Sequence, residues 1–70
     1  MRTLIVDRAD FAYVAELEPI SEPPGHYSLS IASIWRQAKN PTEERVKLNV
    51  LITRDGLLAL RGLINKELSR

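Results

Sequence analysis

The clearest pattern in the chain extends from Val46 to Leu68, where apolar residues change from a period of two to a helical period. In the first part, apolar and polar positions alternate: Val46, Leu48, Val50 and Ile52 are interleaved with Arg45, Lys47 and Asn49. This alternation predicts a β-strand with one dry face and one basic face. Leu51 interrupts the basic face, which predicts that the strand is central in its sheet and covered on both sides near its end.

A helix is predicted to follow this strand directly. Thr53 offers a hydroxyl that can accept a hydrogen bond from the first free N–H groups of a helix, and Asp55 places a negative charge in the first turn. Large apolar residues then recur at helical spacing and share one stripe, at Leu57, Leu60, Ile64 and Leu68, with Leu63 on its flank. We expect this stripe to pack on the sheet.

Leu58 and Gly62 lie four residues apart on roughly the opposite side of that helix. A glycine in the middle of a helix costs about 1 kcal/mol relative to alanine, so its presence needs an explanation. Two interpretations stay open. Gly62 is either a tolerated surface residue or, with Leu58, a close contact with a helix of a second subunit.

The first 36 residues contain three further β-type segments, two before a proline-rich loop and one after it. Leu4–Val6 is short, and Asp10–Glu18 alternates between an aromatic and apolar face and a face that becomes acidic. Arg8 and Ala9 between them form either a bend within one long strand or a turn between two. Pro19 is expected to end the strand, and Glu22–Gly25, with two prolines, is a loop. Tyr27–Arg36 is the next strand.

The polar segment Gln37–Glu44 predicts a hairpin loop that returns the chain to the Val46 strand. Residues 1–70 therefore form a single α+β domain with an antiparallel sheet of three to four strands and one C-terminal helix, in the order β-β-β-α or β-β-β-β-α. One helix cannot cover both faces of such a sheet. The uncovered face must be polar, bind a ligand or pair with another copy, and we expect a homodimer.

Composition narrows the class of protein. A chain of seventy residues forms only a small core, and without cysteine neither a disulfide nor a thiolate metal site can stabilise it further. Dimerisation is the remaining way to bury more apolar surface. The absence of cysteine fits a reducing cytoplasm, and no apolar run is long enough for a membrane span. Residues 1–25 have a net charge of −3 and residues 26–70 a net charge of +4. This uneven charge distribution is suited either to binding a polyanion or to two subunits that meet acidic side to basic side.

The sequence offers no recognisable catalytic or metal-binding set. His26 is the only histidine, and it follows Pro-Pro-Gly, where a loop or strand-edge role is expected. The carboxylate pair Glu16 and Glu18 shares a strand face, but a hard cation needs six or more oxygen ligands. The serines have no base at a recognisable spacing. We therefore expect no enzymatic activity, no metal and no cofactor.

Binding is the remaining chemistry. One aromatic residue and four cations lie within a single predicted hairpin, namely Trp35, Arg36, Lys39, Arg45 and Lys47. A flat aromatic surface stacks on bases and cations follow phosphates, so this set is typical of single-stranded nucleic-acid binding. Trp35 has the same parity as Leu29 and Ile31, so a purely structural core role for it stays open.

The order of segments from residue 27 to 68 resembles that of PC4-like, or Whirly-related, single-stranded DNA-binding proteins. The likeness lies in a strand that ends in Ile34-Trp35, a polar loop, a basic strand that begins Arg45-Val46-Lys47, and a C-terminal helix. The resemblance implies a dimer with a β-channel for DNA, with Trp35 as the stacking aromatic and Arg45 and Lys47 at the entry of the basic strand. Ala32 stands where that family usually has an arginine.

A second hypothesis belongs to another class of protein. The small size, the lack of a catalytic set, the opposed charges of the two halves and an unpaired sheet edge also suit a protein-interaction or inhibitor protein of the phage or mobile-element type. Such a protein would cap a host protein and make no contact with nucleic acid.

Overall fold

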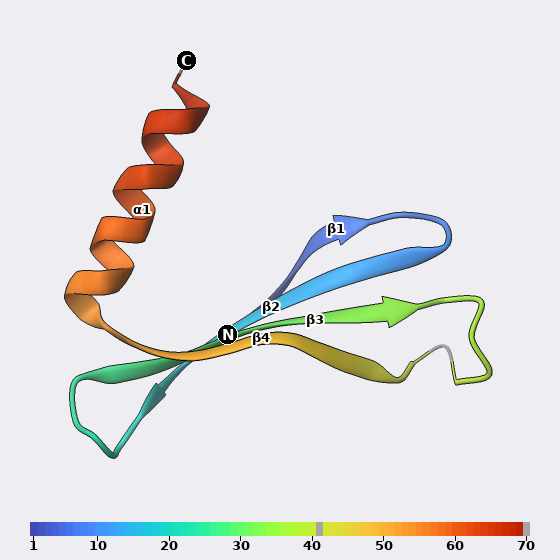
Figure 1. Ribbon diagram of the computed structural model, residues 1–70, viewed down its shortest axis with the longest axis horizontal. Coiled ribbons are helices and arrows are strands. Elements are labelled where there is room, and N and C mark those ends of the chain that lie inside the picture. Colours follow the sequence, from blue (N-terminus) through green and yellow to red (C-terminus); the bar gives the residue numbers. More distant parts are fainter. Residues whose placement is uncertain (41, 70) are drawn as a thin grey trace.

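A computed structural model of the chain describes residues 1–40 and 42–69. Its sheet contains four antiparallel strands in chain order (Figure 1), which are β1 (Arg2–Asp7), β2 (Phe11–Ile20), β3 (His26–Trp35) and β4 (Glu44–Thr53), and β4 leads into the helix α1 (Arg54–Leu68). The predicted α+β fold is confirmed in its four-strand form. Arg8 and Ala9 belong to a turn between two strands, closed by a hydrogen bond of 2.9 Å from the Arg8 N–H to the Phe11 carbonyl.

Pro19 was expected to end its strand, but β2 continues to Ile20, and Pro19 pairs with Tyr27 of β3. The Leu17 N–H points to the β1 side, where it donates to the Met1 carbonyl at 2.8 Å. The backbone nitrogen of Pro19, two residues later, faces the same side, beyond the paired length of β1. A residue without an N–H therefore costs the sheet no hydrogen bond there.

The strand register separates the side chains into two faces. The front face carries most of the large apolar residues: Phe11, Tyr13, Ala15 and Leu17 of β2, Tyr27, Leu29, Ile31 and Trp35 of β3, and Leu48, Val50 and Ile52 of β4. The back face carries smaller or polar residues, including Ala12, Val14, Glu16 and Glu18 of β2 and Ser28, Ser30 and Ala32 of β3. The predicted alternation along β2 and β3 is thus present on both faces of the sheet.

The sheet curls towards its back face. The outer strands of a flat four-stranded sheet lie about 14 Å apart, yet Arg2 of β1 contacts Glu44 of β4 directly. Ala12, Val14 and Ala32 lie on this back face, and among the described residues they are the buried hydrophobic ones, with 1%, 6% and 8% of their surface exposed. The front face is left on the outer side of the curl.

The prediction of a central, doubly covered β4 is wrong. β4 pairs only with β3 and forms one edge of the sheet. Leu51 lies on the back face opposite Ser28 and is 60% exposed. Periodicity did not show how many neighbours the strand has. It also failed at the start of β4, where the register shift places Val46 on the back face and Arg45 on the front face, although Val46 was predicted to share a face with Leu48, Val50 and Ile52.

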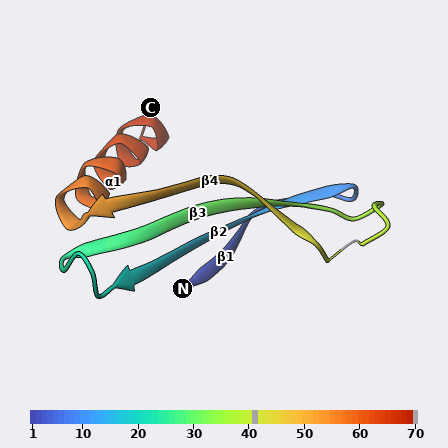
Figure 2. The same cartoon turned by 60° about the horizontal axis from the view of Figure 1, so that its bottom comes forward.

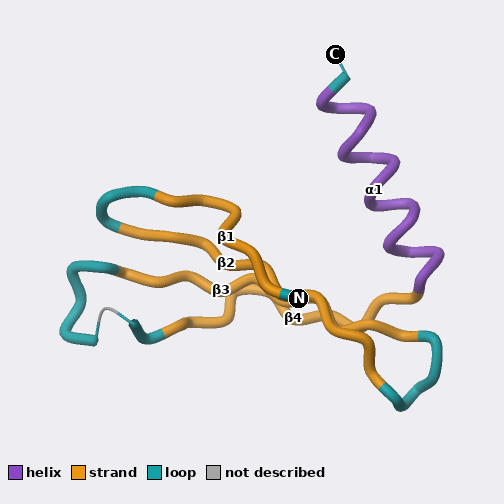
Figure 3. Tube along the Cα trace, turned by 180° about the vertical axis from the view of Figure 1, so that it is seen from behind, coloured by secondary structure: helices purple, strands orange, loops and turns teal. Residues whose placement is uncertain are grey.

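The prediction that the helix stripe packs on the sheet is also wrong. The helix projects away from the sheet, at the end opposite the β1–β2 and β3–β4 turns (Figures 1 and 3), and its main contacts are with β4. Leu57 and Leu60 are half-buried, but exposure rises along the stripe to 48% at Ile64 and 79% at Leu68. None of the described helix residues is buried.

The direction of the helix follows from its joint with β4. Thr53 is the last residue of the strand and Arg54 the first of the helix, so no loop allows the helix to fold back. As predicted, Thr53 caps the helix, because its Oγ1 accepts a hydrogen bond of 3.1 Å from the Gly56 N–H. A Cβ at Gly56 would lie 2.7 Å from Cγ1 of Ile52, so glycine lets the first turn approach the strand.

The result is a thin molecule with an unusually large surface. It measures 39 × 37 × 16 Å, and Figure 2 shows the sheet as a single layer. Its radius of gyration of 14.3 Å exceeds the value of about 11 Å expected for a compact chain of this length. The accessible surface of 5691 Å² is about 1,300 Å² larger than expected for a compact protein of 7.9 kDa. No helix within the described residues is long and apolar enough to cross a membrane.

Candidate nucleic-acid interface

Three aromatic side chains gather on the front face near the β1–β2 turn. β2 and β3 bring Phe11 opposite Trp35, with ring centroids 5.7 Å apart, and Tyr13 packs on Phe11 at 5.3 Å. Both pairs are tilted, in the range that favours aromatic contacts. Trp35 is 48% exposed and Tyr13 36% exposed. This aromatic patch, made of Phe11, Tyr13 and Trp35, therefore offers ring surface to a ligand.

Two cations lie on β4, Arg45 beside the aromatic patch and Lys47 two residues further along the strand. Arg45 pairs with Ser33, two residues before Trp35, so Arg45 and Trp35 are diagonal neighbours on the front face. Lys47 lies in a β-bulge, where the register shifts between Val46 and Leu48. Neither cation forms an ion pair with another described residue, and both are exposed. Their charges are available to an anion from outside.

Arg36 and Lys39 lie at the rim of this group. The Arg36 guanidinium contacts Asp7 Oδ1 at 2.6 Å and donates to the Arg8 carbonyl, so it joins the end of β3 to the β1–β2 turn. Lys39 lies in the turn after β3 and is exposed. The structure thus places the five predicted residues at one end of the sheet. Arg36 is bound to Asp7 and to the Arg8 carbonyl. The side chains of Trp35, Arg45 and Lys47 have no polar partner among the described residues.

Sequence reasoning missed Phe11 and Tyr13 as members of this site. Their parity on β2 was evident, but the pairing of Phe11 with Trp35 depends on the register between β2 and β3. That register is continuous from Ile20 and His26 onwards, so the length of the connecting loop fixes it. The loop predicted at Glu22–Gly25 was the signal that could have located both aromatic residues, because its length determines which residues of β2 and β3 lie opposite each other.

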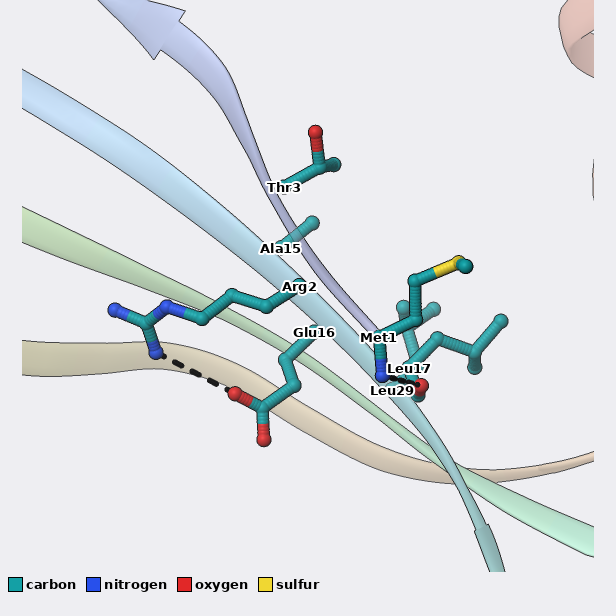
Figure 4. Close-up of a pocket in the computed structure, with 7 residues that line it drawn as sticks. All are labelled: Met1, Arg2, Thr3, Ala15, Glu16, Leu17 and Leu29. Atoms are coloured by element: carbon teal, nitrogen blue, oxygen red, sulfur yellow. Dashed lines mark hydrogen bonds and ion pairs between the residues drawn. The ribbon is translucent and has the colours of Figure 1, made fainter.

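The other half of the front face is aliphatic. This aliphatic patch consists of Leu17, Leu29, Ile31, Leu48, Val50 and Ile52. Leu48 is 42% and Val50 38% exposed. An open depression of about 310 Å³ adjoins the patch where Leu17 and Leu29 meet the N-terminal end of β1 (Figure 4), and Met1, Thr3 and Ala15 also line it. A soluble protein rarely leaves a continuous apolar face of this kind bare.

The back face has a different chemistry. Arg2 reaches Glu16 at 3.4 Å, as drawn in Figure 4, and also contacts Glu44, while the terminal ammonium of Met1 contacts Glu18. The carboxylates of this face therefore outnumber its cations, and those cations are paired. A polyanion would meet repulsion here, so the front face is the better candidate for phosphates.

The described residues contain no group of three or more potential metal ligands. His26 is the first residue of β3, at the end of the sheet opposite the aromatic patch. Its Nδ1 lies 3.1 Å from the carbonyl oxygen of Pro24 in the preceding loop. On the front face, aromatic ring surface lies next to the Arg45 guanidinium, which has no ion-pair partner among the described residues.

Comparisons of the chain with models of known protein families, with curated proteins and with solved structures found no match. The fold is thus that of a small α+β protein with an open front face.

Proposed function

We propose that the chain is a cytoplasmic nucleic-acid-binding module for single-stranded DNA or RNA, which acts as a homodimer. The observation that carries this proposal is the exposed aromatic patch beside Arg45 and Lys47. Bases stack on aromatic side chains at about 1–3 kcal/mol each, whatever their sequence, and the cations follow the backbone phosphates. Arg36 and Lys39 extend the positive rim, and the expected specificity is for single strands, whose bases are free to stack.

The competing function is capture of a host protein by strand addition at a sheet edge. Both edges of this sheet contain a β-bulge, at Ile5 in β1 and at Lys47 in β4. Bulges and lysines on edge strands are features that discourage pairing with another strand. They favour the nucleic-acid hypothesis over the adaptor or inhibitor hypothesis. A stoichiometric protein partner recovered with the chain from a lysate, together with no oligonucleotide binding, would reverse this preference.

The emission of Trp35 tests the proposal directly. Trp35 is the only tryptophan, so its emission has one source. We expect a mixed-sequence single-stranded oligonucleotide to quench it saturably, with affinity falling as salt rises. A site with three phosphate contacts gives a slope of about −2 for the logarithm of affinity against the logarithm of salt concentration. A flat titration would contradict the proposal, and the matching double-stranded oligonucleotide serves as the control.

The homodimer part of the proposal is supported by surface area. The excess of about 1,300 Å² per chain over a compact protein of this mass corresponds to about 2,600 Å² for two chains. This lies within the range of about 2,000–5,000 Å² buried by obligate homodimers. Leu58 and Gly62 are our proposed contact between the two helices. A Cβ at Gly62 would meet no atom within 4 Å in the single chain, so the space beside it is open to a partner helix.

Replacement of Gly62 tests the helix contact. In an isolated helix, Gly62→Leu should raise stability by about 0.5–1 kcal/mol, because glycine is a poor helix former. In a close helix pair, the new side chain separates the helices, and we expect the dissociation constant of the dimer to rise about tenfold or more. Sedimentation equilibrium measures this constant. Gly62→Ala is the matched control, because it gains the helix propensity of a non-glycine residue but adds only a methyl group. Equal dimer affinity in the Gly62→Leu and Gly62→Ala variants would refute the contact.

A further inference from the structure

Two uncovered apolar surfaces of the described chain are complementary in kind. One is the aliphatic patch on the front face, next to the depression lined by Leu17 and Leu29. The other is the distal part of the helix stripe, where Leu63, Ile64 and Leu68 are 59%, 48% and 79% exposed. An apolar sheet face and a row of projecting aliphatic side chains are the usual two halves of a helix-on-sheet core.

These two surfaces cannot meet within one chain. The helix begins at the residue after β4, and the Thr53 cap and the Gly56–Ile52 approach fix its direction away from the sheet. To turn back, the helix would have to lose this cap and unpair the end of β4 from β3, where Ile52 and Thr53 pair with Tyr27 and His26. The surface that covers the helix stripe therefore has to come from another molecule.

We infer that the distal half of α1 packs on the aliphatic patch of a second copy of the chain, and that the second helix packs reciprocally on the first sheet. A second copy supplies both missing surfaces at once, because each chain has one helix and one patch and a two-fold axis exchanges them. The inference rests on the proposed homodimer and specifies its geometry. It does not depend on nucleic-acid binding.

This geometry fits the other surfaces of the molecule. The aliphatic patch and the aromatic patch occupy opposite ends of the front face, since Leu29 pairs with Val50 near the helix end while Trp35 lies near the β1–β2 turn. A partner helix on the aliphatic patch therefore leaves the aromatic patch uncovered. Leu58 and Gly62 lie on roughly the opposite side of the helix from its stripe, so a helix whose stripe packs on the partner's sheet leaves them uncovered.

Disulfide cross-linking tests the inference, because the natural chain has no cysteine. Full-length Ile64→Cys and Leu29→Cys chains, prepared separately, would be mixed, unfolded together, refolded and oxidised. A disulfide between these two variants can form only between chains. Since its Cα atoms must come within about 7 Å, we expect a yield at least about tenfold above that of Lys66→Cys mixed with Leu29→Cys. Lys66 lies on the opposite side of the helix from Ile64.

Leu17→Cys provides a second partner position if Leu29→Cys does not fold, as judged by circular dichroism. A folded dimer that links neither Leu29→Cys nor Leu17→Cys to Ile64→Cys above the Lys66→Cys level would overturn the inference, and so would a folded monomer. Oligonucleotide binding is measured separately on the unmodified chain. A cross-linked dimer without oligonucleotide binding would refute only the nucleic-acid function, whereas an uncross-linked dimer that binds would refute only the reciprocal helix.

Discussion

Val50→Glu should abolish the dimer and strongly destabilise the fold. Val50 lies within the aliphatic patch, where a second copy would cover a carboxylate and leave it without a cation. Burial of an unpaired charge belongs to the few mechanisms that cost more than about 3 kcal/mol in a single substitution. The dissociation constant should therefore rise more than about 100-fold, as measured by sedimentation equilibrium, and the circular dichroism signal should be lost at a lower temperature.

The neighbouring residue provides the control for this experiment. Leu51 lies on the back face of the same edge strand and is 60% exposed, against 38% for Val50. Leu51→Glu introduces the same charge one residue away, and we expect its dimer affinity and unfolding temperature to stay close to those of the parent chain. If the front face is bare in solution, Val50→Glu and Leu51→Glu will behave alike, and the dimer proposal fails.

The second large effect concerns the charges beside the aromatic patch. Arg45→Glu combined with Lys47→Glu should weaken binding of a single-stranded oligonucleotide by at least about 100-fold at low salt, because two charge-assisted phosphate contacts become repulsive. The slope of affinity against salt should become shallower by about 1.4. Fluorescence anisotropy of a labelled oligonucleotide measures both quantities, and the loss should be similar for different base sequences.

A matched pair on the helix separates a local effect from net charge. Arg54→Glu combined with Lys66→Glu changes the charge of the chain by the same amount, but both residues lie on α1, and neither contributes to the aromatic patch. We expect this control to retain most of the parent affinity. Equal losses in the two double variants would mean that only the total charge matters, and unchanged binding in the Arg45→Glu, Lys47→Glu variant would end the proposal.

Local sequence features predicted the elements of this fold well. Thr53 marked the strand-to-helix joint because a capping hydroxyl acts on N–H groups only three residues away, and alternation marked the faces of β2 and β3. Sequence patterns did not predict the surroundings of these elements. Leu51 was assigned to a covered strand and Leu68 to a sheet contact because apolar residues are normally buried, yet both are exposed in the single chain. The sequence shows that these residues are apolar, but it does not show whether the surface that covers them belongs to the same chain or to another one.

The candidate site was predictable to the extent that its residues are close in sequence. Trp35, Arg45 and Lys47 belong to one hairpin, so counting residues brought them together. Phe11 required a register across a second loop, and the engagement of Arg36 by Asp7 required the position of a third strand. Non-local contacts of this kind depend on how three strands are assembled, which alternation within each strand does not specify.

The bulges at Ile5 and Lys47 have a consequence for the size of the assembly. A one-layer sheet with two open edges and an apolar face is the geometry from which fibrils grow by adding strands. Each bulge interrupts the regular ladder of one outer strand, which disfavours growth along the hydrogen-bonding direction. We expect association to take place on the front face instead, where a two-fold pair would cover the apolar surfaces of both members. In the proposed dimer, two local irregularities of the backbone would thus limit the assembly to a pair.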